Sequence, residues 1–391
     1  MKKILIALVL VSNLNSFAAD AITKDSLKWS QRMAFSIMKR HPKIWQIDKQ
    51  EKPKLDYKPT FVLIAFENLY RKTKNEKFNQ YAKEYVDLFV DSLGGISHYD
   101  SKEFNIDHLT IGNLLFDLYE NTKDKRYLTA MQTLRKQLEE QPRTRSGGFW
   151  HKKIYPNQMW LDGIYMEAPF YTHFTTAFEN GKSLDDIAKQ FELIHNNSFD
   201  PISKLPYHTW DESKEIGWAD KQTGTSPTIW SRGVGWYAMA LVDALDYFPK
   251  SHPKRKELVT YLNEVAAALV KQQDKSGLWY QIVDKPNFEG NYLEASGSAM
   301  FAYAFTKGVN KGYLPKSFKK NANQAFDGLI KELVKVDESG EVHLTQISQG
   351  IGLGGNPFRD GSNKYYADSK KNIDNSVGVG AFILAALELN R

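Results

Sequence analysis

Apolar residues along the chain recur mostly at intervals of three and four, the spacing that places them on one face of an α-helix. Strand-like alternation of apolar and polar residues is scarce, so the pattern predicts an all-α protein. The stripes and their end signals predict about twelve helices of roughly 12 to 20 residues each. Their expected positions are near residues 26–41, 58–72, 76–95, 107–121, 124–141, 159–178, 183–198, 229–248, 254–274, 290–311, 316–336 and 372–390.

The predicted helices fall into pairs. Short polar turns such as 72–75 and 121–124 join the two members of a pair, whereas longer connections rich in glycine and aromatic residues lie between pairs. A helical hairpin cannot bury its apolar face alone, so about six hairpins must close on one another or stack. We therefore predict an (α/α)6 barrel, a toroid of six helical hairpins, with the long connections gathered at one mouth to carry the function. A superhelical solenoid is the alternative, but the irregular spacing and the lack of a repeated sequence signature disfavour it.

The first 18 residues are typical of a secretory signal. Lys2 and Lys3 precede an apolar run over 4–11 that is too short to span a bilayer, and small residues follow at 16–18. A buried N-terminal helix is the alternative interpretation. We expect a signal peptide over 1–18 and one catalytic domain over 19–391, exported to the periplasm or the exterior.

Composition narrows the chemistry. The chain has no cysteine, which excludes disulfides, thiolate metal sites and a cysteine nucleophile and suits an oxidising compartment. The 52 lysines and arginines include Lys2 and Lys3, so the mature chain carries 50 basic and 46 acidic residues, a net charge of +4. The lysines are scattered and no later run is apolar enough for a membrane helix, so we expect a monomer with no nucleic-acid or membrane partner. An anionic small substrate is compatible with this charge.

The segment 157–170 contains the strongest candidate for catalysis. Asp162, Tyr165 and Met166 share one helix face, which would place a carboxyl group among aromatic and thioether groups. Such surroundings favour the uncharged, protonated acid that a proton donor requires. An acidic residue in the first turn of a helix is also a common structural feature, and spacing alone does not separate the two interpretations.

Two further segments contain candidate site residues. Asp107 begins a predicted helix at the head of an apolar stripe, where a helix cap is the simpler interpretation. Ser226 and Pro227 are expected to open another helix, on which Arg232 and Trp236 are neighbours one turn apart. An arginine beside a tryptophan suits a sugar carboxylate next to a stacking ring, although a surface arginine on a tightly packed helix has the same pattern.

The remaining polar motifs indicate no cofactor. His208 lies in an aromatic loop without a second histidine at metal spacing, and no calcium loop is present, so we expect no metal. The glycine-rich run over 349–358 lacks the spacing of a nucleotide loop and is interpreted as a mouth loop. Glu294, at the start of a helix rich in small residues, is a minor candidate acid.

Several motifs in order resemble a known family, the unsaturated rhamnogalacturonyl hydrolases of glycoside hydrolase family 105. The similarity extends from about Asn105 to the C-terminus and is strongest in the segments 158–166, 207–213, 218–220, 230–237 and 377–382. The resemblance implies an (α/α)6 barrel, Asp162 as the catalytic aspartate and Asp107 as a second active-site aspartate. By the resemblance, His208, Arg232 and Trp236 match residues that line the sugar pocket. We add Trp160, Tyr165 and Met166 as candidate substrate-binding residues.

The chemistry implied by the resemblance needs no metal or cofactor. Asp162 would protonate C4 of the C4–C5 enol ether in a terminal 4,5-unsaturated uronic acid, and water would attack C5. The expected partner is therefore an anionic unsaturated oligosaccharide, bound as the substrate. The sequence leaves open whether Asp162 or Asp107 activates the water. An unsaturated β-glucuronyl hydrolase acting on ulvan- or arabinogalactan-derived oligosaccharides is an alternative function, and a non-catalytic, exported glycan-binding toroid is another.

Overall fold

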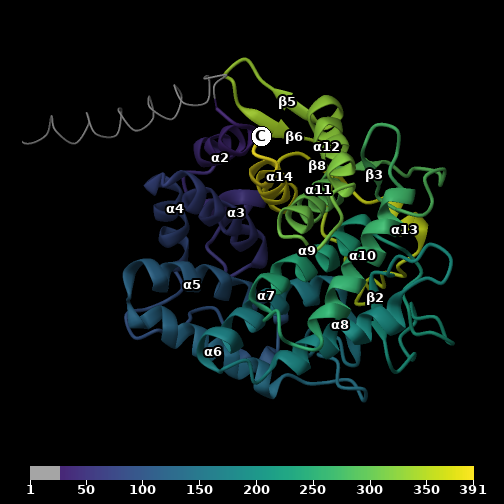
Figure 1. Cartoon of the computed structure of the whole chain (residues 1–391), viewed down its shortest axis with the longest axis horizontal. Helices are drawn as coiled ribbons and strands as arrows, with labels where there is room; N and C mark the ends of the chain where they lie inside the picture. The colour runs from purple at the N-terminus through teal and green to yellow at the C-terminus, as the bar shows by residue number, and fades with distance from the viewer. Residues whose placement is uncertain (1–26) are drawn as a thin grey trace, which may run out of the picture.

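The architecture is a closed ring of helical hairpins. In the computed structural model, which describes residues 27–391, six inner helices succeed one another around a common axis (Figure 1). Each inner helix contacts the next, and the last contacts the first, so the ring is closed as the (α/α)6 prediction requires. The inner helices are α3 (Tyr57–Thr73), α5 (Ile111–Thr122), α7 (Leu161–Phe178), α9 (Ser231–Tyr247), α11 (Ala295–Asn310) and α14 (Ser376–Glu388).

An outer helix packs against each inner helix. The pairs are α14 with α2, α3 with α4, α5 with α6, α7 with α8, α9 with α10, and α11 with α12. The outer helices carry an apolar stripe toward the inner ring and polar residues toward solvent, as the sequence pattern predicted. They are α2 (Trp29–Arg40), α4 (Glu76–Val86), α6 (Lys125–Glu140), α8 (Leu184–Ser198), α10 (Arg255–Lys271) and α12 (Phe318–Gly328).

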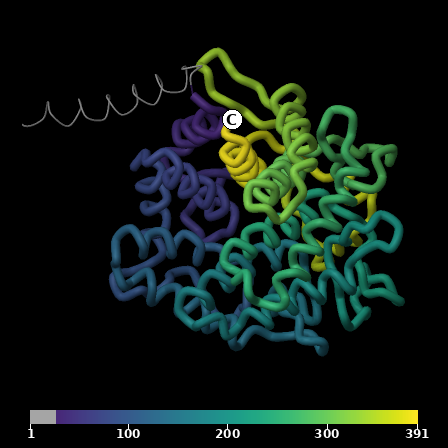
Figure 2. Tube along the Cα trace, viewed as in Figure 1, coloured from purple at the N-terminus to yellow at the C-terminus, as the bar shows by residue number. Residues whose placement is uncertain are grey.

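The two ends of the described chain meet to close the ring. Helix α14 packs between α2 and α3, so the purple start and the yellow end of the trace lie side by side in Figure 2. The Ser30 hydroxyl donates to the Arg391 carbonyl over 3.3 Å. Asp48 accepts from the Asn375 amide and the Ser376 hydroxyl, at 3.1 and 2.6 Å. These long-range contacts connect the last inner helix to the first hairpins.

Short elements line the connections between hairpins. The sequence pattern did not reveal them because two or three residues are too few to show an alternation. The strands form antiparallel pairs in chain order: β1 (Gln158–Trp160) with β2 (Thr209–Asp211), β3 (Trp279–Tyr280) with β4 (Leu293–Glu294), β5 (Val334–Val336) with β6 (Val342–Leu344), and β7 (Ile347–Ser348) with β8 (Lys371–Asn372). The short helices are η1 (Ile44–Lys49), η2 (Ser101–Glu103), η3 (Ile106–Thr110), the π-turn η4 (Leu329–Leu333) and α13 (Asn363–Ala367).

Some predicted helix boundaries were wrong. Ser226 and Pro227 do not open α9, which starts at Ser231, because the Ser226 hydroxyl instead accepts from the Thr209 amide over 3.1 Å and ties the loop to β2. Residues 107–110 form the short helix η3 ahead of α5 rather than its first turn. Helix α4 ends at Val86, where turns follow, and α12 ends at Gly328, where the π-turn η4 continues the helical path until β5 begins at Val334. Both α-helices therefore end earlier than predicted.

Glycines let neighbouring inner helices approach closely. A Cβ atom on Gly235 of α9 would lie 2.6 Å from the Met300 sulfur of α11. A Cβ on Gly297 of α11 would lie 2.7 Å from Cβ of Ser231. Both distances are shorter than van der Waals contact, so these helices can pack this closely only without a side chain at those positions.

The predicted signal peptide over 1–18 and the boundary at residue 19 lie outside the described residues. Within residues 27–391, no helix combines the length and the apolar character that crossing a membrane requires.

Candidate active site

A polar cavity opens at the mouth of the barrel, where several inner helices begin. Its volume is about 320 Å³, and its lining includes Asp107, Asp162 and the first residues of α3. The mouth loops complete it, since Gly350, Ile351 and Gly352 of the glycine-rich run also line the wall. The prediction that this run forms a mouth loop is therefore confirmed.

Asp162 is positioned by the pairing of two short strands. It is the second residue of α7 and directly follows β1, whose Trp160 is paired with Thr209 of β2. The Leu161 amide also donates to the His208 carbonyl over 3.1 Å, which brings the two segments into register. As a result Asp162 Oδ2 lies 2.8 Å from His208 Nε2.

His208 connects Asp162 to a third side chain. The ring is fully buried, and its Nδ1 lies 2.6 Å from the hydroxyl of Tyr366. Burial, with the charge of Asp162 as the next cause, raises the pKa of Tyr366 well above its usual value, so the phenol keeps its proton. We assign the phenol as the donor to Nδ1, which leaves the ring hydrogen on Nε2, where Asp162 Oδ2 accepts it.

The immediate surroundings of Asp162 differ from the apolar ones expected. Tyr165 packs its ring against Trp236 at 4.7 Å, and the Met166 sulfur accepts from the Thr110 hydroxyl at 3.0 Å. The partner that orients Asp162 is instead His208, which comes from a different segment. Helical spacing identified the acid correctly as an inward-facing residue but could not show this contact.

Asp107 forms a second charged cluster in the same cavity. Lys152 Nζ lies 2.5 Å from Asp107 Oδ2, and His151 Nε2 lies 3.4 Å from Oδ1. Burial, the largest single cause, acts to raise the pKa of Asp107, but Lys152 above all, with His151 and His108, holds the pKa below the ordinary value. Burial lowers the pKa of His151 to about 4, so this ring is neutral near pH 7. Asp107 is therefore an ionised carboxylate.

Aromatic rings form one wall beside the two aspartates. The rings of Tyr155 and His151 both stack against Trp160, with their centroids 5.0 and 5.3 Å from its centroid, and against each other at 6.3 Å. The buried ring of His208 makes a T-shaped contact with Trp160, with 5.1 Å between the ring centroids. Trp160 itself lines the cavity, as expected for a sugar-contacting residue.

The mouth of the cavity is rich in positive charge. Lys54, Lys58 and Arg359 line it, and among the described residues none of the three forms an ion pair with a carboxylate. The Arg359 guanidinium donates only to backbone carbonyls, those of Gly354 at 2.8 Å and Leu353 at 3.2 Å. Inner helices α3 and α7 begin at this cavity, and helix N-termini add partial positive charge. Because Lys152 is paired with Asp107, the three cations that are free among the described residues face two remaining carboxylates of the lining, Asp56 and Asp162, and the balance favours an anionic ligand.

Several residues expected in the sugar pocket lie behind it. Arg232 is buried and donates to the Ser296 hydroxyl at 3.0 Å and to the Ser348 carbonyl, and it does not line the cavity. Trp236 is fully buried against Phe61, at 4.8 Å between centroids. Tyr165 and Met166 are likewise buried in the barrel core. His208, also expected in the pocket, is fully buried and does not line the cavity either. Direct contact of these five residues with a sugar stays a prediction.

Sequence reasoning missed important members of the site. Neither Tyr366 nor the pair formed by His151 and Lys152 was singled out, although the pair lies in one of the long connections expected at the mouth. Tyr57 and Arg359 also line the cavity without having been predicted. The sequence indicated these residues only indirectly, because they lie next to predicted inner helices or in long loops rich in aromatic residues and glycine.

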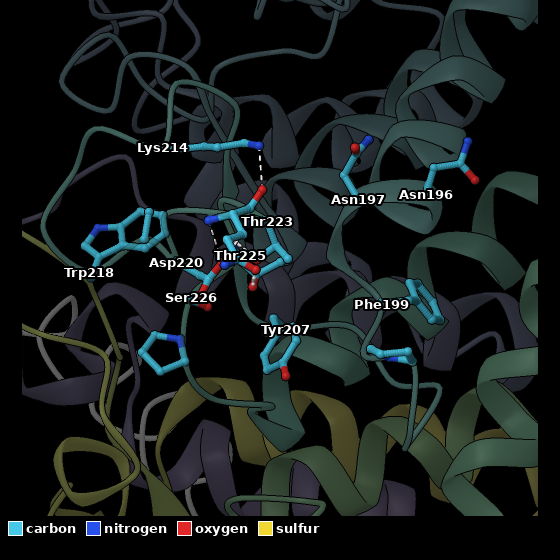
Figure 3. Close-up of a pocket in the computed structure, with 14 residues that line it drawn as sticks. Asn196, Asn197, Phe199, Tyr207, Lys214, Trp218, Asp220, Thr223, Thr225 and Ser226 are labelled. Atoms are coloured by element: carbon cyan, nitrogen blue, oxygen red, sulfur yellow. Dashed lines mark hydrogen bonds between the residues drawn. The ribbon is translucent and has the colours of Figure 1, made fainter.

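A larger cavity in the same half of the molecule lacks comparable chemistry. It has a volume of about 620 Å³ and lies between the end of α8 and the loop over 199–227 (Figure 3). Its carboxylate, Asp220, accepts from the Gln222 and Thr223 amides at 2.8 and 2.7 Å and thereby stabilises a turn. No residue lines both this cavity and that of Asp162 among those described. Size alone does not identify the active site.

One group of potential metal ligands occurs in the described part of the chain. Asp337, Glu341 and His343, at the β5–β6 hairpin, bring ligand atoms within 4.8 Å of one another. Glu341 is neutralised by Lys39 at 2.6 Å and Arg40 at 3.2 Å. The group does not line the cavity that holds Asp162, so we do not connect it with the reaction.

Comparison with known proteins extends over nearly the whole described chain. Residues 29–391 match Glycosyl Hydrolase Family 88. The unsaturated rhamnogalacturonyl hydrolase YesR of Bacillus subtilis (strain 168) is 31% identical over 291 residues, which is 73% of this chain and 76% of YesR. Protein Atu3128 of Agrobacterium fabrum is 35% identical over 229 residues, 57% of this chain and 97% of that protein.

A solved structure is similar along almost its entire length. The glycoside hydrolase from family 105 of C. acetobutylicum ATCC 824 shares 40% sequence identity and superposes with a TM-score of 0.89. The match covers 93% of this chain and 99% of that one. The resemblance to family 105 that the motifs indicated is therefore confirmed.

Proposed function

Because the chain belongs to glycosyl hydrolase family 88 and is thus a glycoside hydrolase, we propose that it removes the terminal 4,5-unsaturated uronic acid from lyase-generated oligosaccharides. The relation to YesR favours unsaturated rhamnogalacturonyl oligosaccharides as substrates. The observation that carries the proposal is the contact of 2.8 Å between the buried His208 and Asp162, which lines the cavity.

The charges of the cavity suit a uronate. An unsaturated uronic acid carries a carboxylate on C5, and Lys54, Lys58 and Arg359 supply positive charge without carboxylate partners in the described structure. The stacked rings of Trp160 and Tyr155 offer an apolar surface for the flat, unsaturated ring. A neutral sugar would leave this positive charge unused.

Asp162 is the proton donor of the proposed reaction. Its Oδ2 accepts from His208, and no group of the described residues hydrogen-bonds its Oδ1, so a proton on Oδ1 is available to the substrate. Transfer of that proton to C4 of the enol ether breaks the C4–C5 double bond and leaves positive charge shared by C5 and the ring oxygen. The charge develops beside a carboxylate that has become negative, which stabilises it.

Water completes the reaction at C5. Both oxygens of Asp107 face a donor, Lys152 or His151, whereas Oδ1 of Asp162 becomes free once its proton has left. We therefore assign water activation to Asp162 and the orientation of substrate and water to Asp107. Water adds its oxygen to C5 and returns a proton to Asp162. The hemiketal opens at the C5–O5 bond, and the resulting hemiacetal at C1 releases the shortened saccharide.

The test compares unsaturated and saturated substrates. Lyase-generated oligosaccharides are offered beside the same compounds with the C4–C5 double bond reduced, and products are separated by chromatography. We expect loss of the ultraviolet absorbance of the unsaturated unit with release of the shortened saccharide, and no cleavage of the saturated compound. Cleavage of both compounds at similar rates would show attack at the anomeric carbon and contradict the proposal.

We also propose that the enzyme is exported as a monomer to the periplasm or the exterior. Support comes from the charged, apolar and small-residue regions over 1–18 and from the absence of cysteine. N-terminal sequencing of the protein recovered from cell fractions tests the export, with Ala19 expected near the new start. Light scattering tests the monomer.

A further inference from the structure

A small internal cavity lies behind the wall of the active site. Its volume is about 10 Å³, and its lining includes Glu167 of α7. His151 and Trp160 line both this small cavity and the one that holds Asp162. We propose that Glu167 is a positioning residue: through one buried water molecule it holds the ring hydrogen of His151 on Nε2, the nitrogen that faces Asp107. The inference rests on the proposed function, because it explains how one acid of that site is oriented.

Both carboxyl oxygens of Glu167 are buried without a partner. The residue is 1% exposed, and no group of the described residues hydrogen-bonds either oxygen. Burial, with the charge of Asp186 as the next cause, raises the pKa of Glu167 well above its usual value, so the carboxyl group keeps its proton near pH 7. The nearby cation Arg143 donates instead to both oxygens of Asp186, at 2.7 and 2.8 Å. Glu167 is therefore a neutral acid with a hydrogen to donate.

His151 presents a buried nitrogen to the same space. Its Nδ1 has no hydrogen-bond partner among the described residues, whereas its Nε2 lies 3.4 Å from Asp107 Oδ1. A Cβ atom on Gly163 would lie 2.7 Å from Nδ1, so this nitrogen faces the bare backbone of α7. Glu167 is four residues further along the same helix face, and helical side chains lean toward the N-terminus of their helix. The carboxyl group of Glu167 and Nδ1 of His151 therefore reach the same cavity.

The other nitrogen and oxygen atoms of the side chains that line the small cavity already have partners. Gln190 Oε1 accepts from the Phe149 amide over 2.8 Å, and Gln190 Nε2 donates to the Gly147 carbonyl over 3.3 Å. Trp160 Nε1 donates to Gln158 Oε1 over 3.1 Å. A water molecule in this cavity therefore meets two groups that need a partner, the carboxyl group and Nδ1.

One water molecule satisfies both of these groups. A cavity of about 10 to 15 Å³ is the smallest that admits a water molecule, and buried waters bind polar groups that the protein leaves without a partner. The water accepts the hydrogen of Glu167 and donates one of its own to Nδ1, which must then carry a lone pair. The ring hydrogen of His151 is thereby kept on Nε2, facing the ionised Asp107. In the opposite tautomer a lone pair of Nε2 would face this negative carboxylate.

The tautomer of His151 is measured by nitrogen NMR on the full-length enzyme labelled with isotopic histidine. The His151→Gln variant identifies the signals of this ring. We expect hydrogen on Nε2 in the wild type and in Glu167→Gln, because the glutamine amide can still donate to the water. Glu167→Leu removes the donor and leaves the ring to Asp107 alone, whose oxygen is 3.4 Å away, so the form with hydrogen on Nδ1 should become detectable.

Activity provides a second readout, with circular dichroism to verify each fold. Glu167→Leu should lower kcat about tenfold and leave KM nearly unchanged, by analogy with other groups that orient a histidine. Glu167→Gln should restore kcat to within about twofold of the wild type. Glu67→Leu is the matched control, since Glu67 is also a buried glutamic acid whose oxygens have no partner among the described residues, but it does not line the small cavity. It should change neither kcat nor the signals of His151.

Three results would each overturn the inference. They are a wild-type His151 ring with its hydrogen on Nδ1, a Glu167→Leu variant with the tautomer and the kcat of the wild type, and a Glu167→Gln variant as slow as Glu167→Leu. The spectra need no substrate, so they test the inference separately from the proposed function. A wild-type enzyme that is inactive on every unsaturated oligosaccharide would overturn the proposed function and leave the tautomer assignment in place.

Discussion

His208 Nε2 lies 2.8 Å from Asp162 Oδ2, although 46 residues separate the two in the chain. The contact depends on the pairing of β1 with β2, which places the loop containing His208 over the first turn of α7. It fixes one oxygen of the acid and leaves the other facing the cavity. Asp162 Oδ1, which no group of the described residues hydrogen-bonds, is the oxygen that we propose to deliver the proton.

Tyr366→Phe should lower kcat while leaving KM nearly unchanged. The tyrosine hydroxyl lies 2.6 Å from His208 Nδ1, and its loss allows the ring hydrogen to move from Nε2 to Nδ1, away from Asp162. We expect a loss of roughly tenfold to a hundredfold in kcat by analogy with other groups that orient a histidine. Tyr207→Phe is the control, because its hydroxyl contacts Asp200 at 3.3 Å in the unrelated cavity. Equal kcat values for wild type and Tyr366→Phe would contradict this role.

Lys152→Met should move the acidic limb of the pH–activity profile to higher pH. Burial is the largest influence on the pKa of Asp107, and Lys152 is the strongest of the groups that counter it and hold this pKa below its usual value. Without it, Asp107 gains a proton at a higher pH, and the ionised form that the reaction uses is lost earlier as the pH falls. The measurement is kcat/KM from acidic to neutral pH. Lys153→Met, a change at the exposed neighbouring lysine, should leave the profile in place, and coincident profiles for all three proteins would refute the assignment.

Glu67→Gln should stabilise the protein increasingly as the pH rises. Burial first, and Asp117 second, raise the pKa of Glu67 from 4.5 to about 8. Between these values the folded chain keeps a proton that the unfolded chain has lost, so the wild-type free energy of unfolding falls as the pH rises. Glutamine cannot ionise and removes this dependence. Each pKa unit corresponds to about 1.4 kcal/mol, so the free energies of unfolding of the two proteins should diverge by at most roughly 4 to 5 kcal/mol. Urea denaturation at pH values from about 4 to 8 measures it, and a difference between the proteins that is independent of pH would exclude the explanation.

Gly297→Ala should destabilise the barrel without a direct effect on the site. The new Cβ would lie 2.7 Å from Cβ of Ser231 and 2.8 Å from its backbone carbon, so helices α9 and α11 must separate. The cost is about 1 to 3 kcal/mol and outweighs the helix propensity gained, which is at most about 1 kcal/mol. Gly350→Ala is the control, since its Cβ would meet nothing within 4 Å. Equal denaturation midpoints for both variants would argue against tight packing at this crossing.

The fold was predictable because helices leave a strong periodic signal. Outer helices such as α6 and α8 bury one stripe and expose the opposite face, so their sequences show the three- and four-residue spacing clearly. The pairing of helices into hairpins could be predicted from the short polar turns that join them. Contacts such as the one between Ser30 and Arg391, by which α14 closes the ring, leave no local signal in the sequence. Closure could therefore be inferred only because isolated hairpins would leave apolar faces exposed.

The site was predictable only in part. Helical spacing left the roles of Asp162 and Asp107 open, and the family resemblance named both as active-site residues. Their partners His208 and Lys152 come from loops whose positions depend on tertiary structure. Arg232 and Trp236 were expected in the pocket because they share a helix face. Inner helices are buried on nearly every side, so sharing a face does not distinguish the cavity from the contacts between helices.

Asp162→Asn tests the central claim most directly. Asparagine keeps the shape of the side chain and can still contact His208, but it has no acidic proton to give to C4. The absorbance of an unsaturated oligosaccharide is followed for wild type and variant, with circular dichroism to verify the fold. We predict that kcat of the variant falls by about a hundredfold to ten-thousandfold. Equal rates of absorbance loss for a folded Asp162→Asn variant and the wild type would contradict the account.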